Sequence, residues 1–451
     1  MRWPKGILGP APGLKEINLI CWGLFFLVLV APLSVLLGMQ LRAGKGFDFV
    51  YFYGIGRLAN DHAVVNLYNY DQQVRIFNEL SPLHDGFYGP SPYPPYVALF
   101  FSLFARIPFK LAYLVWMAVS LTLYLIGVSA AVRQVFQEER LKRSLVLCLS
   151  LAFPPFLWTT LVNGQIASIA VCGVGLATLL ERKQRFVLSG IALSMLSYKP
   201  TLLLLLIPML LLTRRLKTLL GFVTGFAGMV LIATLFDGIE IWTAYAHFLR
   251  FFSQVSRIGN HTHLQDWQFI DFNSHSYAIA GGRSAVGLAV LIGIGAVAVG
   301  WLATLLWKSA NGQEAEQFLA WAATLTWTLL LNIYVPIYDS ILVTIAVLLT
   351  LGALRELNWA NATNLVVLLA LVTLVVAWFT EAVAKTYGFQ PLTILFLALG
   401  IVQCSILHRV IRQRAVHGQA QFSTTTSAKS DRSPSAFSLS SSKAVFPARL
   451  T

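Results

Sequence analysis

The sequence predicts an all-α polytopic membrane protein with about 11–12 transmembrane helices and two long extracytoplasmic loops. Of its 451 residues, 57% are hydrophobic and only 12% are charged, whereas a soluble domain carries about 25% charged residues. Apolar runs of the length that a transmembrane helix needs, about 20 residues, recur along almost the whole chain. The net charge of +14 is explained by an excess of Lys and Arg in cytoplasmic segments, so we expect no nucleic-acid partner.

The first apolar segment is Ile17–Gly38, and it follows Arg2, Lys5 and Lys15. It is longer than the apolar region of a signal peptide, and no small-residue cleavage site follows it. The sequence therefore predicts a cytoplasmic N-terminus over residues 1–16 and an uncleaved first span.

Further spans are expected in apolar stretches that short polar or basic turns separate. These are Pro108–Val132, Ser144–Leu161, Ile166–Leu180, Thr218–Phe236, Ala278–Trp307, Phe318–Tyr334, Ser340–Leu354, Asn364–Thr380 and Pro391–His408. A polytopic membrane domain thus covers residues 17–408. Residues 409–451 form a basic, Ser/Thr-rich tail without apolar periodicity, and this composition is typical of a disordered cytoplasmic segment.

The segment Phe186–Thr213 differs from the others because it is too long for one span. A continuous helix of this length would measure about 42 Å, against a hydrocarbon core of about 30 Å. Lys199-Pro200 interrupts it in the middle, and basic residues flank both of its ends. Two short helices that meet at Lys199-Pro200 would leave both flanks in the cytoplasm, so we expect a hairpin rather than one tilted span.

This topology places the larger share of the Lys and Arg residues in the cytoplasm, as the positive-inside rule requires. The two long loops, at about residues 42–95 and 237–277, then face outward. In the second loop Ile241, Tyr245, Phe248 and Phe252 recur at helical spacing, which predicts an amphipathic helix on the outer leaflet.

Asp48 is the candidate catalytic residue because it lies at the membrane surface within the aromatic run Phe47–Gly54. An apolar setting raises the pKa of a carboxylate and suits it to act as a general base. An ordinary interfacial Asp that bonds to nearby backbone is the alternative. Farther along the chain, Tyr93-Pro94-Pro95 could contact a substrate or could simply cap a helix. Arg106 could likewise contact a substrate, or its side chain could snorkel to the membrane surface.

Lys199 is the second candidate, because a Lys within an apolar span costs about 2.5–3.5 kcal/mol on insertion scales and should face a cavity or a partner. It could receive a phosphate group, or it could pair with an acid such as Asp339. Gln165, in the turn Asn163-Gly164-Gln165, could line the same cavity or simply cap the turn.

The sequence contains no Walker A motif, no GxGxxG after a strand, no GxSxG and no HExxH, so we expect no cofactor. Polar loops often contain His and Asp without binding a metal, and the second loop contains His261, His263, Asp266 and His275. A real site needs fixed geometry and outer-shell partners, so we expect no metal.

Taken together, the motifs and their order resemble glycosyltransferase family 87 of the C-type membrane superfamily over roughly residues 17–408. The motifs are Asp48-x-x-Tyr51, Leu67-Tyr68, Tyr93-Pro94-Pro95, Asn163-Gly164-Gln165, Lys199-Pro200 and Tyr338-Asp339. The family includes mycobacterial phosphatidylinositol mannoside mannosyltransferases. The resemblance implies a multi-pass enzyme of the plasma membrane (the bacterial inner membrane). It would transfer a hexose, usually mannose, from a polyprenyl-phosphate sugar donor to a lipid or glycan acceptor, with inversion and with Asp48 as base.

The chemistry agrees with these residues. Inverting transfer needs one base for the acceptor hydroxyl, and a phosphate leaving group needs only positive charge. Lys199, Arg57 and Arg106 could supply that charge. The substrate-binding residues that we expect are therefore Tyr51, Arg57, Tyr93, Arg106, Asn163, Gln165, Lys199, Tyr338 and Asp339.

A transporter or flippase of lipid-linked sugars is the main alternative, since a broken helix with a buried Lys suits one. The Lys199-Pro200 interruption has no pseudo-symmetric second copy, which disfavours that interpretation. A non-catalytic membrane scaffold would leave Asp48 and Lys199 unexplained.

Overall fold

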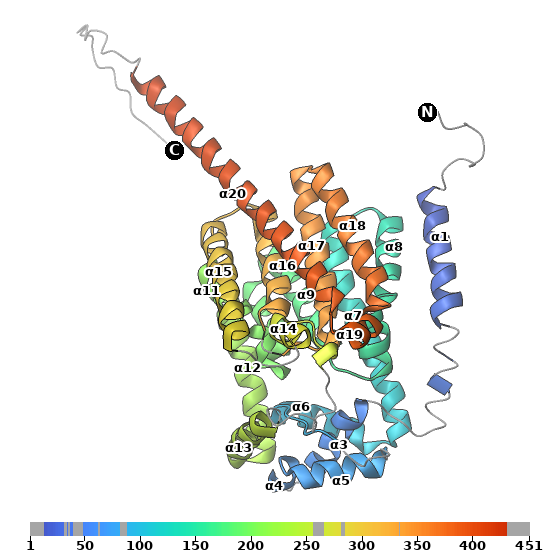
Figure 1. Cartoon of the computed structure of the whole chain (residues 1–451). Coiled ribbons are helices and arrows are strands. Elements are labelled where there is room, and N and C mark those ends of the chain that lie inside the picture. The colour runs from blue at the N-terminus through green and yellow to red at the C-terminus, as the bar shows by residue number, and fades with distance from the viewer. Residues whose placement is uncertain are drawn as a thin grey trace, which may run out of the picture.

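The computed structural model describes residues 13–30, 34, 37–38, 48–61, 64–81, 88–255, 266–280, 285–332 and 334–430. Over these residues the regular secondary structure is helical, with one isolated bridge between Phe269 and Pro336. The predicted all-α fold is therefore confirmed (Figure 1). Residues 1–12 of the predicted N-terminal segment and residues 431–451 of the predicted tail lie outside the described part.

Six described helices are long and apolar enough to cross a membrane, or seven if one bent pair counts as a span. Their elements are α7 (Phe109–Val135), α12 (Leu216–Asp237), α15 (Ala285–Ser309), η7 with α17 (Ile337–Ile341 and Leu342–Leu357), α18 (Ala360–Ala377) and α20 (Pro391–Ser430). Two other predicted spans are the shorter helices α9 (Ser168–Arg182) and α16 (Glu314–Leu330). The residues of α16 are nearly all buried, so this helix lies inside the bundle.

The first predicted span is described only in part, as α1 (Leu14–Leu24) and η1 (Phe25–Val30). It contacts α8 (Arg140–Leu151) through two side chains. Asn18 donates to the carbonyl of Leu141 at 2.6 Å, and the Trp22 indole donates to the Ser144 hydroxyl at 2.8 Å. Figure 1 shows α1 at the edge of the bundle, beside α8.

The predicted span Ser144–Leu161 is bent. The chain follows α8 with the π-helix η3 (Pro155–Val162), and the two axes differ by 60°. Pro154 and Pro155 stand at the break and lack backbone N–H groups, which interrupts helical hydrogen bonding. The bend directs the chain into the turn at Asn163.

The segment Phe186–Thr213 is a hairpin, as the sequence predicts. Its elements are α10 (Phe186–Ser194), η4 (Met195–Tyr198), η5 (Pro200–Leu203) and α11 (Leu206–Leu212). Arg215, after α11, donates to Glu181 at 2.9 Å, and Glu181 lies just before α10. Gly190 of α10 also packs against the first turns of α12, where an added Cβ would collide with the Thr218 carbonyl. Both ends of the segment thus lie at one end of the bundle.

The two predicted outer loops are largely helical and lie at the opposite end from Arg215. The first contains α3 (Phe49–Asn60), α4 (Val64–Leu67), α5 (Tyr70–Leu80), α6 (Pro95–Ser102) and η2 (Phe104–Arg106). The second contains α13 (Glu240–Val255), η6 (Asp266–Gln268) and α14 (Phe272–Ala280), and α19 (Thr380–Tyr387) follows α18. In Figure 1 the helices α3 to α6 and α13 gather at the bottom of the bundle.

The amphipathic helix predicted in the second loop is present as α13, but its apolar face does not lie on the lipid. Ile241 and Phe248 are buried, and the Tyr245 ring packs at a tilt against Tyr68 of the first loop, with centroids 5.2 Å apart. The spacing predicted the helix correctly and its surroundings wrongly, because protein and lipid are both apolar partners for such a face.

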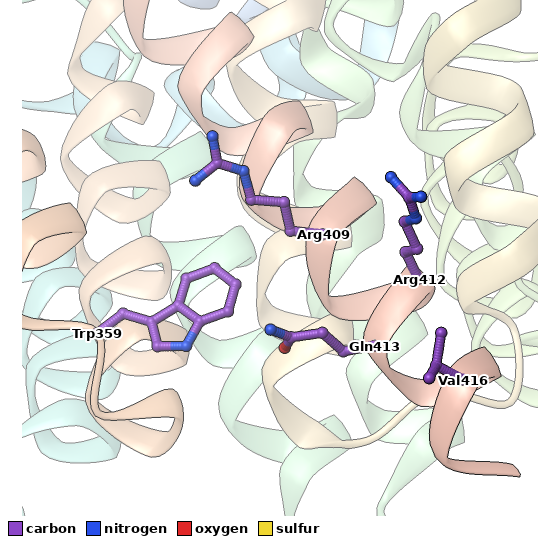
Figure 2. A pocket seen from close by; sticks show the side chains of 5 residues that line it. All are labelled: Trp359, Arg409, Arg412, Gln413 and Val416. Carbon is purple, nitrogen blue, oxygen red and sulfur yellow. The ribbon is translucent and has the colours of Figure 1, made fainter. Parts of the chain in front are cut away.

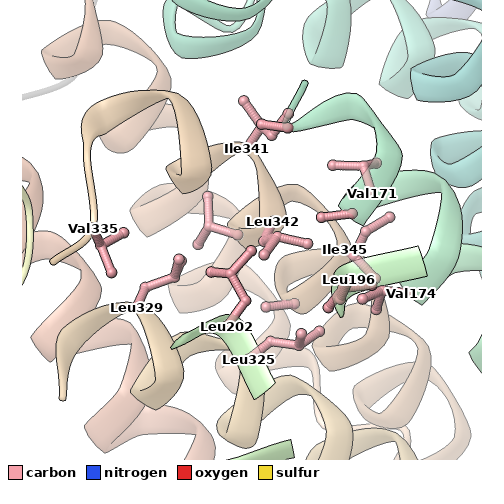
Figure 3. Close-up of a cluster of buried hydrophobic side chains, with 14 of the residues drawn as sticks. Val171, Val174, Leu196, Leu202, Leu325, Leu329, Val335, Ile341, Leu342 and Ile345 are labelled. Carbon is pink, nitrogen blue, oxygen red and sulfur yellow. The ribbon is translucent and has the colours of Figure 1, made fainter. Parts of the chain in front are cut away.

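An apolar cluster fixes the position of the Lys199 turn. Leu196 and Leu202 flank the turn, and both are fully buried. They pack among side chains of α9, α16, α17 and the segment that precedes α17 (Figure 3), including Val171, Val174, Leu325, Leu329, Val335, Ile341, Leu342 and Ile345. Because close-packed interiors allow little displacement, the backbone on both sides of Lys199 is held in place.

The last helix, α20, extends beyond the predicted end of the membrane domain. It continues to Ser430, so residues 409–430 of the predicted tail belong to it. Residues with high helix propensity, such as Arg, Gln and Ala, fill the stretch just after His408, and they can prolong a helix that packing has already started.

Candidate active site

Asp48 occupies the N-cap position of α3 and is partly buried. Its Oδ2 accepts a hydrogen bond from the side-chain amide of Gln165 at 2.8 Å. The backbone N–H of Phe49 donates to the Asn163 carbonyl at 3.1 Å, so two bonds join the first outer loop to the turn after η3. Burial raises the pKa of the Asp48 carboxyl above its ordinary value, and the bond from Gln165 opposes part of that shift.

Gly164 gives the turn its shape. Its φ is +74°, and a Cβ at this position would lie 2.7 Å from the Cβ of Phe49. The Trp116 indole donates to the Gly164 carbonyl at 2.9 Å, and the Tyr113 hydroxyl donates to the Val162 carbonyl. The turn is therefore fixed from both sides, and it presents Gln165 to Asp48.

We expect Gly164→Ala to destabilise the protein by about 2–4 kcal/mol, because it adds left-handed backbone strain and a steric clash with Phe49. Thermal unfolding of the detergent-solubilised protein measures the effect. Gly228→Ala is the matched control, since Gly228 lies within α12 and an added Cβ would meet nothing within 4 Å. An unchanged melting temperature for Gly164→Ala would show that the turn is not fixed in this way.

Lys199 forms an ion pair with Asp339, and its Nζ donates to Asp339 Oδ2. The Lys199 side chain is 11% exposed and the Asp339 side chain is fully buried. The ring centroids of Tyr334 and Tyr338 lie 5.2 Å and 5.1 Å from Nζ, within cation–π range. Of the two partners considered for Lys199, the acid is the one that the structure shows.

Three tyrosines are within electrostatic range of both Asp48 and Asp339, and we call Tyr93, Tyr334 and Tyr338 the tyrosine cluster. Asp48 interacts electrostatically with each member, and Lys199 lies over two of them. The side chains of Tyr93 and Tyr338 also interact with each other. The cluster therefore places the carboxylate and the ammonium group, which are 151 residues apart in the numbering, at one site.

Several buried polar atoms near this site have no hydrogen-bond partner among the described residues. They are the hydroxyls of Ser197, Tyr198, Thr201 and Ser340, together with Asp339 Oδ1 and Gln165 Oε1. Buried polar groups are normally paired, so such a group of free donors and acceptors suits a polar ligand. The motifs in the sequence did not predict a role for these hydroxyls or for Tyr334, whose only signal was proximity in sequence to Lys199 and Asp339.

Tyr51 lies near Asp48, as expected. Its ring packs edge-on against Phe77 and Tyr88, at 5.0 Å and 5.6 Å, and Asp48 acts on it electrostatically. Asn163 contributes its backbone carbonyl rather than its side chain to the described contacts.

Two predicted cations are not brought to the site. Arg57 lies nine residues after Asp48, which places it about 180° around α3, and it pairs with Glu79 at 3.6 Å while 46% of its side chain is exposed. Arg106 ends η2, and no contact in the described part of the chain joins it to Asp48 or Lys199.

Asp271, which the sequence analysis did not single out, supports the tyrosine cluster. Its fully buried carboxylate accepts from the Val335 N–H at 2.9 Å, from the Ser274 N–H at 2.9 Å and from the Ser274 hydroxyl at 3.0 Å. Phe269 also packs against Tyr334, with the ring centroids 4.6 Å apart and the ring planes tilted by 50°. The second outer loop thereby holds the strand-like segment that carries Tyr334. The Asp-x-x-Ser spacing of a helix N-terminus was the available signal.

Of the histidines considered as metal ligands, His261 and His263 lie outside the described residues. Within the described ranges, no group of three or more His, Cys, Asp or Glu side chains is close enough to hold a metal ion.

The model of glycosyltransferase family 87 matches residues 92–332, which is more than half of the chain. The matched region contains Tyr93, Gln165 and Lys199, whereas Asp48 and Asp339 lie on either side of it. No curated protein and no solved structure matches the sequence.

Proposed function

The chain belongs to glycosyltransferase family 87, and from this membership we propose that it transfers a hexose, with mannose as the first candidate, from a polyprenyl-phosphate donor. The acceptor is a lipid or a glycan at the extracytoplasmic face, and the anomeric configuration is inverted. The enzyme would work as a multi-pass protein of the plasma membrane, the inner membrane in a bacterium.

The observation that carries this proposal is the tyrosine cluster shared by Asp48 and the Lys199–Asp339 pair. A single displacement needs a base on one side of the sugar and a stabilised leaving group on the other. Asp48 would take the proton of the acceptor hydroxyl while that oxygen bonds to the anomeric carbon. Gln165 occupies Oδ2, so we assign the proton to Oδ1.

The bond between the anomeric carbon and the phosphate oxygen then breaks, and the polyprenyl phosphate leaves with the electron pair. Lys199 has three N–H donors, of which Asp339 takes one. The remaining donors, together with the free hydroxyls of Ser197 and Thr201, would bind the phosphate. Asp339 would hold the ammonium group in position.

The proposal is tested with the purified protein in detergent, radiolabelled polyprenyl-phosphate mannose and a crude pool of lipid and glycan acceptors. We expect label to move to an acceptor, because a transferase needs no sealed membrane. A transporter or flippase, which the broken helix at Lys199 would also suit, would show no transfer in detergent but would move the labelled donor across reconstituted vesicles. That pair of results would overturn the proposal.

The proposed topology puts Ser253 of α13 outside and Ala415 of α20 inside. Both residues are exposed. We expect Ser253→Cys, but not Ala415→Cys, to react with an impermeant maleimide in intact cells, in a background in which the four native cysteines are replaced. Lysed cells are the control, because both variants should then react. Labelling of Ala415→Cys alone in intact cells would invert the topology and place the site in the cytoplasm.

A further inference from the structure

A basic hollow lies at the end of the bundle opposite the candidate active site. Its volume is about 540 Å³, and it is lined by Trp359, Arg409, Arg412, Gln413 and Val416. Figure 2 shows Arg409 and Gln413 on the side of α20 that faces Trp359, with Arg412 at the other edge. The proposed transfer reaction uses none of these residues.

The hollow lies toward the far end of α20 from the tyrosine cluster. At the start of this helix, the Thr393 hydroxyl donates at 2.9 Å to the carbonyl of Ile270, whose own N–H donates to Val335 beside the tyrosine cluster. Arg409 and Val416 follow Pro391 by 18 and 25 residues, which is about 27–38 Å along a helix axis. Trp359 stands just after the candidate span Ile337–Leu357, which begins beside the tyrosine cluster. The hollow therefore lies at the far end of that span, at the headgroup level of the opposite leaflet, which is the cytoplasmic one in the proposed topology.

The four α20 residues of the hollow share one face of the helix. Their positions in the sequence place them within an arc of about 100°. Trp359 reaches the same space from the turn between α17 and α18, where Asn358 has a φ of +56°. An indole at this level is typical of a membrane–water interface. The hollow thus combines an interfacial aromatic ring with two guanidinium groups.

The charge of the hollow is not compensated within the described part of the chain. Four other arginines at this end each pair with a glutamate: Arg182 with Glu314, Arg215 with Glu181, Arg355 with Glu139, and Arg414 with Glu316. Arg409 and Arg412 have no such partner there, and no acidic residue lines the hollow. A guanidinium group that lacks a carboxylate can bind a phosphate through paired N–H donors.

We propose that this hollow binds the phosphate headgroup of an anionic phospholipid from the cytoplasmic leaflet. Arg409 and Arg412 contact the phosphate, and the Trp359 ring packs beside the glycerol and the first methylene groups. Such a lipid would hold α20 against the turn between α17 and α18. This site is independent of the proposed transfer reaction.

The test uses the full chain in a neutral detergent, titrated with phosphatidylglycerol, with bound lipid counted by native mass spectrometry. We expect one tightly bound phosphatidylglycerol, and about 20- to 30-fold weaker binding in the double variant Arg409→Gln/Arg412→Gln, since each surface cation contributes about fivefold. Trp359→Ala should weaken binding several-fold while both charges remain. Unchanged binding in both variants would overturn the proposal.

Arg140→Gln/Arg143→Gln is the matched control, because these arginines have the same spacing and the same charge at the same end of the bundle but are not among the residues that line the hollow. An equal loss of binding in this control would show that binding depends on the overall positive charge of this end of the protein, and it would overturn the proposed site. Equal binding of phosphatidylcholine would contradict the role of headgroup charge. Displacement of the lipid by glycerol 1-phosphate at equal concentration would assign the hollow to free phosphates instead of lipids.

Discussion

Asp48→Asn is expected to lower the rate of transfer by about 10²- to 10⁴-fold, the usual contribution of a general base. Asn has nearly the same shape and keeps an oxygen that can accept the bond from Gln165, so the turn at Gly164 should remain in place. It cannot take a proton from the acceptor hydroxyl. Initial rates with labelled donor, together with the melting temperature and donor affinity, separate the loss of a base from a loss of structure.

Asp61→Asn and Asp71→Asn are the controls, because both carboxylates belong to the same outer loop but are exposed. They should keep most of the activity. An Asp48→Asn variant within a few-fold of the wild-type rate would exclude Asp48 as the base. If Asp61→Asn were inactive instead, the base would lie farther along the same loop.

The pH dependence follows from the same carboxylate. A base works only when ionised, and burial raises the pKa of Asp48, so activity should fall with acidification at a pH above the range of an ordinary Asp. The bond from Gln165 favours the ionised form. Gln165→Leu should therefore shift this acidic limb to higher pH, whereas Asn163→Ala, which keeps the backbone carbonyl, should leave it in place. If the wild type, Gln165→Leu and Asn163→Ala had the same acidic limb in their pH–rate profiles, the pH dependence would not arise from Asp48.

Lys199→Met is expected to destabilise the protein by about 3–5 kcal/mol, because it leaves the fully buried carboxylate of Asp339 without its cation. The double variant Lys199→Met/Asp339→Leu removes both charges and should recover most of the stability. Unfolding in detergent measures both effects. Arg57→Met is the control: it breaks the exposed pair with Glu79 and should cost less than about 1 kcal/mol.

Donor binding in the double variant separates the two roles of Lys199. If Lys199 binds the donor phosphate, the double variant should bind polyprenyl-phosphate mannose more weakly than the wild type does, even though its stability is restored. A double variant with normal donor affinity would show that the ion pair is structural only. A stable Lys199→Met single variant would instead contradict the structural role of the pair.

The sequence by itself determined the features that the bilayer imposes. Apolar runs must be helices in a membrane because the backbone has no other hydrogen-bond partners there. The hairpin at Lys199-Pro200 followed in the same way, since a single helix over this segment would be longer than the hydrocarbon core is thick. The free-energy cost of placing a Lys within an apolar span also identified Lys199 as a candidate, without knowledge of its partner. These arguments are local, and each needed only the residues within one segment.

Only the tertiary structure decided which of the singled-out residues meet. Asp48 and Gln165 are 117 residues apart, and Lys199 and Asp339 are 140 residues apart; no periodicity within a segment specifies such pairs. The same packing put α13 on the first loop instead of the lipid and brought Asp271 to the backbone of Val335. Helix periodicity fixes the direction of a side chain only relative to its own helix axis. The contacts between helices then set the rotation of each axis, and with it the composition of the site.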